Sequence, residues 1–136
     1  MSRTKKNCLF CLISLIIGCL LYILFRPNTY IGRIFTGFGC VDTVRQICSH
    51  YASDLFKFYL PDFLWAFSLG CGLISIQKPK IVGVVICSFC SFLCGFMWEL
   101  LQYFHVISGT ADIHDVIMYF LASAICIIIN IKEINQ

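Results

Sequence analysis

Two short polar motifs interrupt an otherwise apolar stretch near the C-terminus. Glu99 and Gln102 are three residues apart, as are Asp112 and Asp115, and Tyr119 follows four residues after Asp115. Residues three or four apart share one face of a helix, so each motif presents its polar groups together. Grouped carboxylates can bind a cation, hydrogen-bond a sugar or an amine, or hold a proton for acid–base chemistry. These motifs are the first candidates for a functional site.

Three further polar residues are expected at the same level as these motifs. Asp62 begins one apolar segment, Arg26 follows another, and His105 continues the row formed by Glu99 and Gln102. A carboxylate at a membrane boundary is costly unless it is paired, hydrated or protonated. We therefore expect ligand-binding groups among Glu99, Gln102, Asp112, Asp115, Asp62, Arg26, Tyr119 and His105.

A purely structural interpretation stays open for most of the acids. Asp112 is a good N-cap type, Asp115 lies where a first helical turn is expected, and Asp62 suits a helix start. Glu99 is harder to explain in this way because it lies near the C-terminal end of its apolar segment. A negative charge is disfavoured there by the helix dipole.

The elements that must position these residues are membrane-spanning helices. Hydrophobic residues make up 60% of the 136 residues and charged residues only 12%, whereas soluble domains carry about 25%. Four apolar segments predict spans at approximately 8–25, 60–77, 81–104 and 112–131, each close to the ~20 residues that a bilayer requires. Short turns make the last three spans antiparallel neighbours. The predicted fold is a single all-α membrane domain, residues 1–136, forming a four-transmembrane-helix bundle.

The long connection between the first two spans predicts one further helix. Apolar residues recur at helical spacing from Val41 to Phe58, with polar residues available for the opposite face. We expect an interfacial amphipathic helix at 41–58, lying on the membrane surface. The aromatic residues Trp65, Trp98, Tyr59 and Tyr103 are expected to form a belt at the membrane boundary.

Positive charge predicts the orientation in the plasma membrane. Arg3, Lys5, Lys6, Lys78, Lys80 and Lys132 fall on one side of the four spans, against Arg26, Arg33, Arg45 and Lys57 on the other. The positive-inside rule then places the N- and C-termini in the cytoplasm and the acidic motifs outside. Two alternatives concern the first span: a cleaved signal peptide, or lipoprotein-type cleavage at Cys19. We favour a retained span because the apolar run continues through Phe25.

The ten cysteines predict neither a disulfide framework nor a metal site. Eight lie inside apolar runs, where cysteine acts as a small hydrophobic residue. Cys87, Cys90 and Cys94 share a helix face but lack histidine partners, so no metal and no cofactor are expected. Cys40 and Cys48 lie in the long connection, and a disulfide between them stays open. The net charge of +3 indicates no nucleic-acid partner.

The polar motifs resemble those of the VanZ-like family of small bacterial membrane proteins. Trp98-Glu99-Leu-Leu-Gln102 resembles the family's Glu-x-x-Gln motif, and Asp112-Ile-His-Asp115 its Asp-x-x-Asp motif. Pro61-Asp62-Phe-Leu-Trp65 is similar to the start of the family's second span. The sequence departs from the pattern at Thr110, Tyr119 and Ala122, where many members carry Arg, Asn and Gly. The resemblance implies a cell-envelope protein and, through the family's namesake, a link to glycopeptide resistance.

Three functions are compatible with these features. The preferred one is a non-enzymatic protein whose outer carboxylates bind a lipid head group or a lipid-linked envelope precursor, with membrane lipids as its other partners. A second is a membrane enzyme that uses Glu99 and Asp115 as an acid–base pair on a lipid-linked substrate. A third is a small transporter, although no charged residue lies deep within any predicted span.

Overall fold

The computed structural model describes residues 2–26, 33–35, 37–78 and 80–134, and no strand occurs in that part of the chain. Four helices are long and apolar enough to cross a membrane. The first, third and fourth of these spans correspond to α1 (Arg3–Phe25), α5 (Ile81–Tyr103) and α6 (Ile113–Ile134). The second, Leu55–Ile76, consists of α4 (Leu60–Ile76) and the turn that precedes it. The predicted all-helical architecture with four candidate spans is confirmed by these lengths and compositions.

The first helix begins before its apolar run. The Ser2 hydroxyl accepts a hydrogen bond from the Lys5 backbone N–H at 3.4 Å, which caps α1 at Arg3 rather than at Cys8. The Arg3 guanidinium then donates to the Ile74 and Gln77 carbonyls at the end of α4, at 3.3 and 3.0 Å. The basic N-terminal segment is therefore part of the bundle.

The connection between α1 and α4 differs from the single helix predicted at 41–58. Helix α3 (Gly39–Tyr51) ends at Ala52, which has extended backbone. The π-helical turn η1 (Leu55–Tyr59) continues directly into α4, and the Leu60 N–H bonds to the Leu55 carbonyl. Pro61 explains this widening, because proline lacks an N–H and its ring would clash with a carbonyl four residues earlier. Leu55–Tyr59 thus belongs to the second span rather than to the connecting helix.

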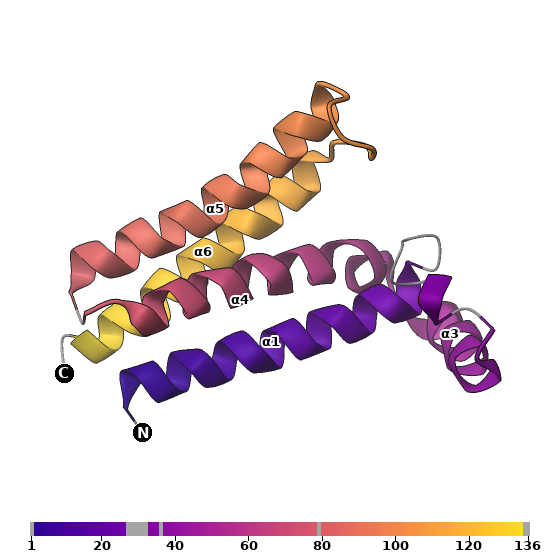
Figure 1. The fold of residues 1–136 in the computed structure, drawn as a ribbon, viewed down its shortest axis with the longest axis horizontal. Helices are drawn as coiled ribbons and strands as arrows, with labels where there is room; N and C mark the ends of the chain where they lie inside the picture. The colour runs from indigo at the N-terminus through magenta and orange to yellow at the C-terminus, as the bar shows by residue number, and fades with distance from the viewer. Residues whose placement is uncertain (1, 27–32, 36, 79, 135–136) are drawn as a thin grey trace.

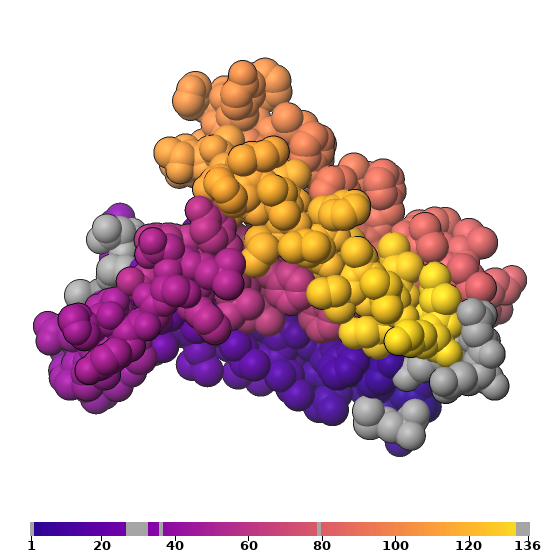
Figure 2. All heavy atoms as spheres, turned by 180° about the vertical axis from the view of Figure 1, so that it is seen from behind, coloured from indigo at the N-terminus to yellow at the C-terminus, as the bar shows by residue number. Residues whose placement is uncertain are grey.

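Helix α4 lies at the centre of the bundle. It packs along α1 and also contacts α5 and α6, which pair with each other. Figure 1 shows α5 and α6 leaning away from α1 toward the turn that joins them. Both chain termini lie at the opposite end of the bundle from that turn. Helix α3 projects as a separate lobe beyond the end of α1 (Figures 1 and 2).

Small and hydroxyl-bearing residues let these helices approach closely. A Cβ added at Gly70 would lie 3.0 Å from the Cys126 sulfur, so glycine is what fits between α4 and α6. The Ser91 hydroxyl donates to the Ala66 carbonyl at 2.6 Å, and the Ser68 hydroxyl donates to the Cys11 carbonyl at 2.9 Å. Such contacts are the usual means of helix association where lipid removes the hydrophobic driving force.

Arg45 attaches α3 to the end of α1. Its guanidinium donates to the Ile23 and Leu24 carbonyls at 2.9 and 3.2 Å, and it pairs with Asp42 at 3.1 Å. The last carbonyls of a helix have no partners within the helix, so a basic side chain is a suitable cap for them.

The cysteines are free thiols throughout the chain. Cys40 and Cys48 both lie on α3, two turns and roughly 12 Å apart along its axis. A disulfide requires much closer Cα atoms, so the pairing left open by the sequence is wrong within one chain. Cys71 and Cys126 are buried between α4 and α6, with their sulfurs 3.7 Å apart.

Candidate functional site

Glu99 is the centre of the polar cluster. It lies near the end of α5 and is only 5% exposed. Its Oε2 accepts a hydrogen bond from the Asp112 backbone N–H at 2.9 Å, and its Oε1 accepts one from the Tyr119 hydroxyl at 3.3 Å. Both oxygens therefore act as acceptors, which a carboxylate satisfies fully and an amide cannot. Glu99 joins α5 to the start of α6 through these two bonds.

Tyr119 reaches Glu99 because α5 carries a glycine one turn earlier. A Cβ added at Gly95 would lie 2.5 Å from the Tyr119 ring, closer than real side chains approach. The ring therefore packs directly onto the α5 backbone and is buried with Ala66 and Ala122. Its hydroxyl also interacts with Asp62 on α4. Tyr119 thus lies between the carboxylates of Glu99 and Asp62. The spacing of the motifs predicted only that Tyr119 shares a helix face with Asp115.

Asp62 forms the ion pair that links the first two spans. The Arg26 guanidinium donates to Asp62 Oδ2 at 3.1 Å and to the Phe58 carbonyl at 3.0 Å. The Arg26 guanidinium also lies over the Tyr22 ring, 5.2 Å from its centroid. Charge-assisted bonds of this kind are the strong ones where water is scarce. The structure therefore brings Arg26 and Asp62 together with the acidic motifs, as the sequence predicted.

Asp115 lies within electrostatic range of the other acids, in the first turn of α6. It interacts repulsively with Asp62, Glu99 and Asp112, and attractively with Arg26. Its Oδ1 is buried and accepts no hydrogen bond from the described residues. A buried carboxylate oxygen without a donor is costly, so this position suits a group that interacts with something further. Glu99 and Asp115 share one polar neighbourhood, although Tyr119 and not Asp115 contacts Glu99 directly.

Asp112 has an evident structural role at the start of α6. Its Oδ1 accepts a hydrogen bond from the His114 N–H at 2.9 Å and lies 2.8 Å from His114 Nδ1. These bonds, with the backbone bond first in importance, hold the pKa of Asp112 below its ordinary value. The side chain is therefore an N-cap, and it is the Asp112 backbone N–H that reaches Glu99.

The remaining two predicted residues shape the turn rather than line the cluster. In its better-satisfied orientation, the Gln102 amide donates to the Thr110 carbonyl at 3.1 Å and accepts from Trp98 Nε1 at 3.1 Å. Gly109 has a φ of 142°, and a Cβ there would collide with this amide. His105 has a left-handed φ of 56°, lies just past the end of α5 and is exposed. It does not join the site because the helix has ended before it.

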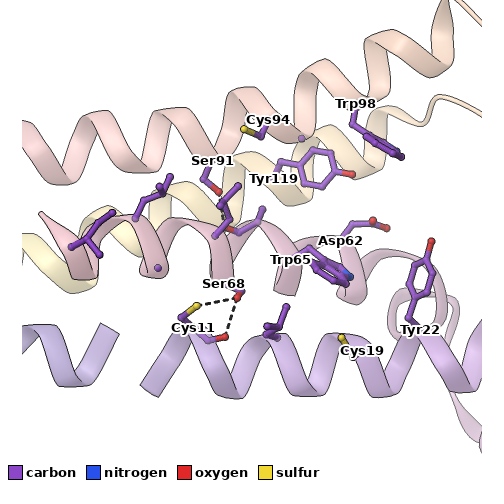
Figure 3. Close-up of a pocket in the computed structure, with 17 residues that line it drawn as sticks. Cys11, Cys19, Tyr22, Asp62, Trp65, Ser68, Ser91, Cys94, Trp98 and Tyr119 are labelled. Atoms are coloured by element: carbon purple, nitrogen blue, oxygen red, sulfur yellow. Dashed lines mark hydrogen bonds between the residues drawn. The ribbon is translucent and has the colours of Figure 1, made fainter. Parts of the chain in front are cut away.

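A cavity of about 800 Å³ begins beside Asp62 and Tyr119, the members of this cluster that line it, and extends along the bundle. Its floor is α4, and α1 and α5 form its sides. Figure 3 shows Asp62 at one end, with Tyr22, Trp65, Trp98 and Tyr119 around it. The two tryptophans expected in an aromatic belt thus line a single cavity, whereas Tyr103 is 67% exposed.

Sequence reasoning missed two contributors to this site. Gly95 carried a usable signal, because it lies one turn before Glu99 in a helix where glycine is otherwise unfavourable. His114 lies inside the Asp-x-x-Asp motif, where its ring contacts Asp112 and packs at a tilt against the Tyr59 ring, with the two centroids 5.3 Å apart. Nothing in its spacing distinguished it from an ordinary surface histidine.

The chemistry available is that of carboxylates, a phenol and aromatic faces. Within the described residues, no group of three His, Cys, Asp or Glu side chains is placed to hold a metal ion. Cys87 is buried, whereas Cys90 and Cys94 are exposed. The arrangement can bind a cation or a hydrogen-bond donor, or exchange a proton between Glu99, Asp115 and a ligand.

Comparison with protein-family models, with curated proteins and with solved structures found no match.

Proposed function

We propose that this chain is a non-enzymatic membrane protein of the cell envelope, similar to the VanZ-like family, that binds a polar ligand at its carboxylate cluster. Glu99 carries the proposal, because it is a buried acid held in place by Asp112 and Tyr119 beside two more acids, Asp62 and Asp115. Grouping acids from three helices is unfavourable unless a partner compensates them. The ligand class is a lipid head group or a lipid-linked envelope precursor.

The charge distribution supports an extracytoplasmic site. The basic residues Arg3, Lys5, Lys6, Lys78, Lys80 and Lys132 lie on the helix ends that carry the termini, opposite the acidic cluster. By the positive-inside rule, both termini then lie in the cytoplasm of a bacterial cell. In this arrangement, helix α3 lies on the extracytoplasmic surface of the plasma membrane. Its side chains Val44, Ile47 and Tyr51 are exposed and need an apolar environment.

Binding of soluble head-group compounds tests this function. Phosphoethanolamine, glycerol phosphate and glucosamine are added separately to the purified protein, and its thermal unfolding is followed. We expect at least one compound to raise the unfolding temperature of the wild type and not that of Glu99→Gln. Asp42→Asn is the control, because Asp42 pairs with Arg45 on α3, away from the cluster. The same stabilisation in Glu99→Gln would contradict the proposal.

The link to envelope antibiotics has a separate test. A bacterium susceptible to glycopeptides expresses the wild type or Glu99→Gln at equal membrane abundance. We expect the wild type to raise the glycopeptide concentration that inhibits growth and the variant to leave it unchanged. Equal tolerance in both strains would remove the cluster from any role in resistance.

A membrane enzyme is the second candidate. The buried Oδ1 of Asp115, which accepts no hydrogen bond from the described residues, lies near Glu99 and favours an acid–base pair. Turnover of an added lipid-linked precursor by the purified protein would support this function over simple binding. A transporter has less support, because the charged side chains of the described spans lie near the helix ends.

A further inference from the structure

The cavity beside the polar cluster has two chemically different parts. Around Asp62, the cavity is lined by four aromatic side chains: Tyr22 from α1, Trp65 from α4, Trp98 from α5 and Tyr119 from α6 (Figure 3). Aromatic faces together with a carboxylate are the combination that recognises ammonium groups, through cation–π attraction and ion pairing. This end of the cavity is therefore suited to a positively charged, partly desolvated group.

The rest of the cavity is apolar and elongated. It follows α4 from Asp62 to Ile76, which corresponds to roughly 21 Å along a helix. Its walls there include Leu15, Leu69 and Leu73. This length exceeds the thickness of one half of a bilayer's hydrocarbon core, which is about 15 Å, so it can hold an acyl chain. An apolar furrow of this length beside a polar end matches the shape of a lipid, with a head group at Asp62 and a chain along α4.

Charge complementarity decides which lipid fits best. Asp62 lines this end of the cavity, and the acids Glu99 and Asp115 interact electrostatically with it from α5 and α6. The guanidinium beside them, Arg26, is already bonded to Asp62. An anionic head group would be repelled by this set, whereas an amine would be attracted.

We propose that the cavity binds an amine-bearing lipid, with its ammonium group among Asp62 and the four aromatic rings and its acyl chain along α4. This inference rests on the proposed function and names its ligand class. The end at Asp62 binds the head group, and the part along α4 binds the acyl chain. Substitutions along α4 should therefore affect lipids but not a soluble head-group compound.

Native mass spectrometry of the purified protein tests the preference. Phosphatidylethanolamine, phosphatidylglycerol and a glucosyl diacylglycerol with the same chains are titrated separately. We expect phosphatidylethanolamine to bind about tenfold more tightly than phosphatidylglycerol, as one added cation–π contact or ion pair would provide. Asp62→Asn should abolish this preference. Equal affinities for the two phospholipids, or a preference for the glucosyl lipid, would overturn the proposal without any variant.

A matched pair of substitutions tests the chain-binding part. Leu69 lines the cavity and is 40% exposed, whereas Leu121 on α6 lies outside it and is 44% exposed. Leu69→Trp should weaken binding of phosphatidylethanolamine, because the added ring occupies the furrow, and Leu121→Trp should leave it unchanged. Equal lipid binding by the two variants would exclude the furrow as the chain site.

Soluble phosphoethanolamine separates this inference from the proposed function. It has no acyl chain, so its binding should survive Leu69→Trp and be lost in Glu99→Gln. If phosphoethanolamine binds in this way but the lipids show no preference, the lipid inference fails and the proposed function stands. If phosphoethanolamine binding does not depend on Glu99 and the lipids show no preference, both proposals fail together.

Discussion

Among single residues, Glu99 is held most firmly by its neighbours in the polar cluster. Its two acceptor bonds hold the turn before α6 and the Tyr119 phenol, so Glu99 has a structural task whatever ligand binds. Leaving a buried donor unpaired costs about 1–3 kcal/mol. The abundance and stability of Glu99→Gln must therefore be measured beside its activity, and the compound-binding test compares proteins that are folded.

Gly95→Ala should lower the free energy of unfolding by about 1–3 kcal/mol, because its Cβ would overlap the Tyr119 ring. Gly83→Ala on the same helix is the control, since the nearest atoms to its Cβ would be 3.8 Å away. That change should stabilise the helix by about 0.5–1 kcal/mol. Unfolding in mixed micelles measures both. In a Tyr119→Ala background the cost of Gly95→Ala should disappear, and a persisting cost would refute the ring contact.

Asp112 allows the capping role to be separated from ligand binding. Asp112→Ala should lower the free energy of unfolding by about 1 kcal/mol, whereas Asp112→Asn should retain most of the cap. The folded-state pKa of Asp112 is lowered by its bonds from His114, so its ionisation stabilises the fold above the unfolded pKa of about 3.9. This contribution should be lost as the pH falls through the folded pKa, and Asp112→Asn should not show that loss. Unfolding at neutral and acidic pH checks the difference.

At the scale of elements, α1 and α6 are tied together at the end that carries the termini. Asn7 and Asn130 are both fully buried, and Asn7 Nδ2 donates to Asn130 Oδ1 at 2.7 Å. Asn130 in turn donates to the Cys126 carbonyl at 2.9 Å. This pair lies at the opposite end of the bundle from the Arg26–Asp62 ion pair, so α1 is held by polar contacts at both ends.

Asn7→Leu should destabilise the bundle, because Asn130 Oδ1 would lose its donor without water to replace it. Interhelical hydrogen bonds in membranes average about 0.6 kcal/mol and reach about 1.7 kcal/mol. The double variant Asn7→Leu/Asn130→Leu should recover part of this loss, since both polar groups are then removed. A double-mutant cycle of unfolding free energies in micelles gives the coupling, and a value of zero would contradict the pairing.

At the scale of the whole molecule, the prediction concerns orientation. Ser108 is exposed in the turn between α5 and α6, and Ser2 is exposed at the opposite end. In a Cys40→Ser/Cys48→Ser background, Ser108→Cys should react with a membrane-impermeant maleimide on intact cells. Ser2→Cys should react only after the membrane is broken. Labelling in the reverse order would place the acidic cluster in the cytoplasm and end the extracytoplasmic site.

The sequence by itself determined the four apolar helices and which polar residues lie near their ends. The share of charged residues is low, and the four apolar runs have the length of spanning helices, which satisfy their own backbone hydrogen bonds in lipid. The three-residue spacing of the two motifs placed Glu99 and Asp115 on helix faces that a short turn must bring together. These features are local, so they can be read from the order of residues.

The tertiary structure decided what those residues touch. That Glu99 binds the Asp112 backbone and Tyr119, that Pro61 widens the preceding turn into η1, and that Trp65 and Trp98 share one cavity all depend on how α4 packs against its neighbours. Helix packing is set by small residues such as Gly70 and Gly95 on particular faces, and their partners lie on other helices far along the chain. Apolar residues are distributed almost evenly around a lipid-facing helix. Their pattern in the sequence therefore cannot specify which helix faces pack together.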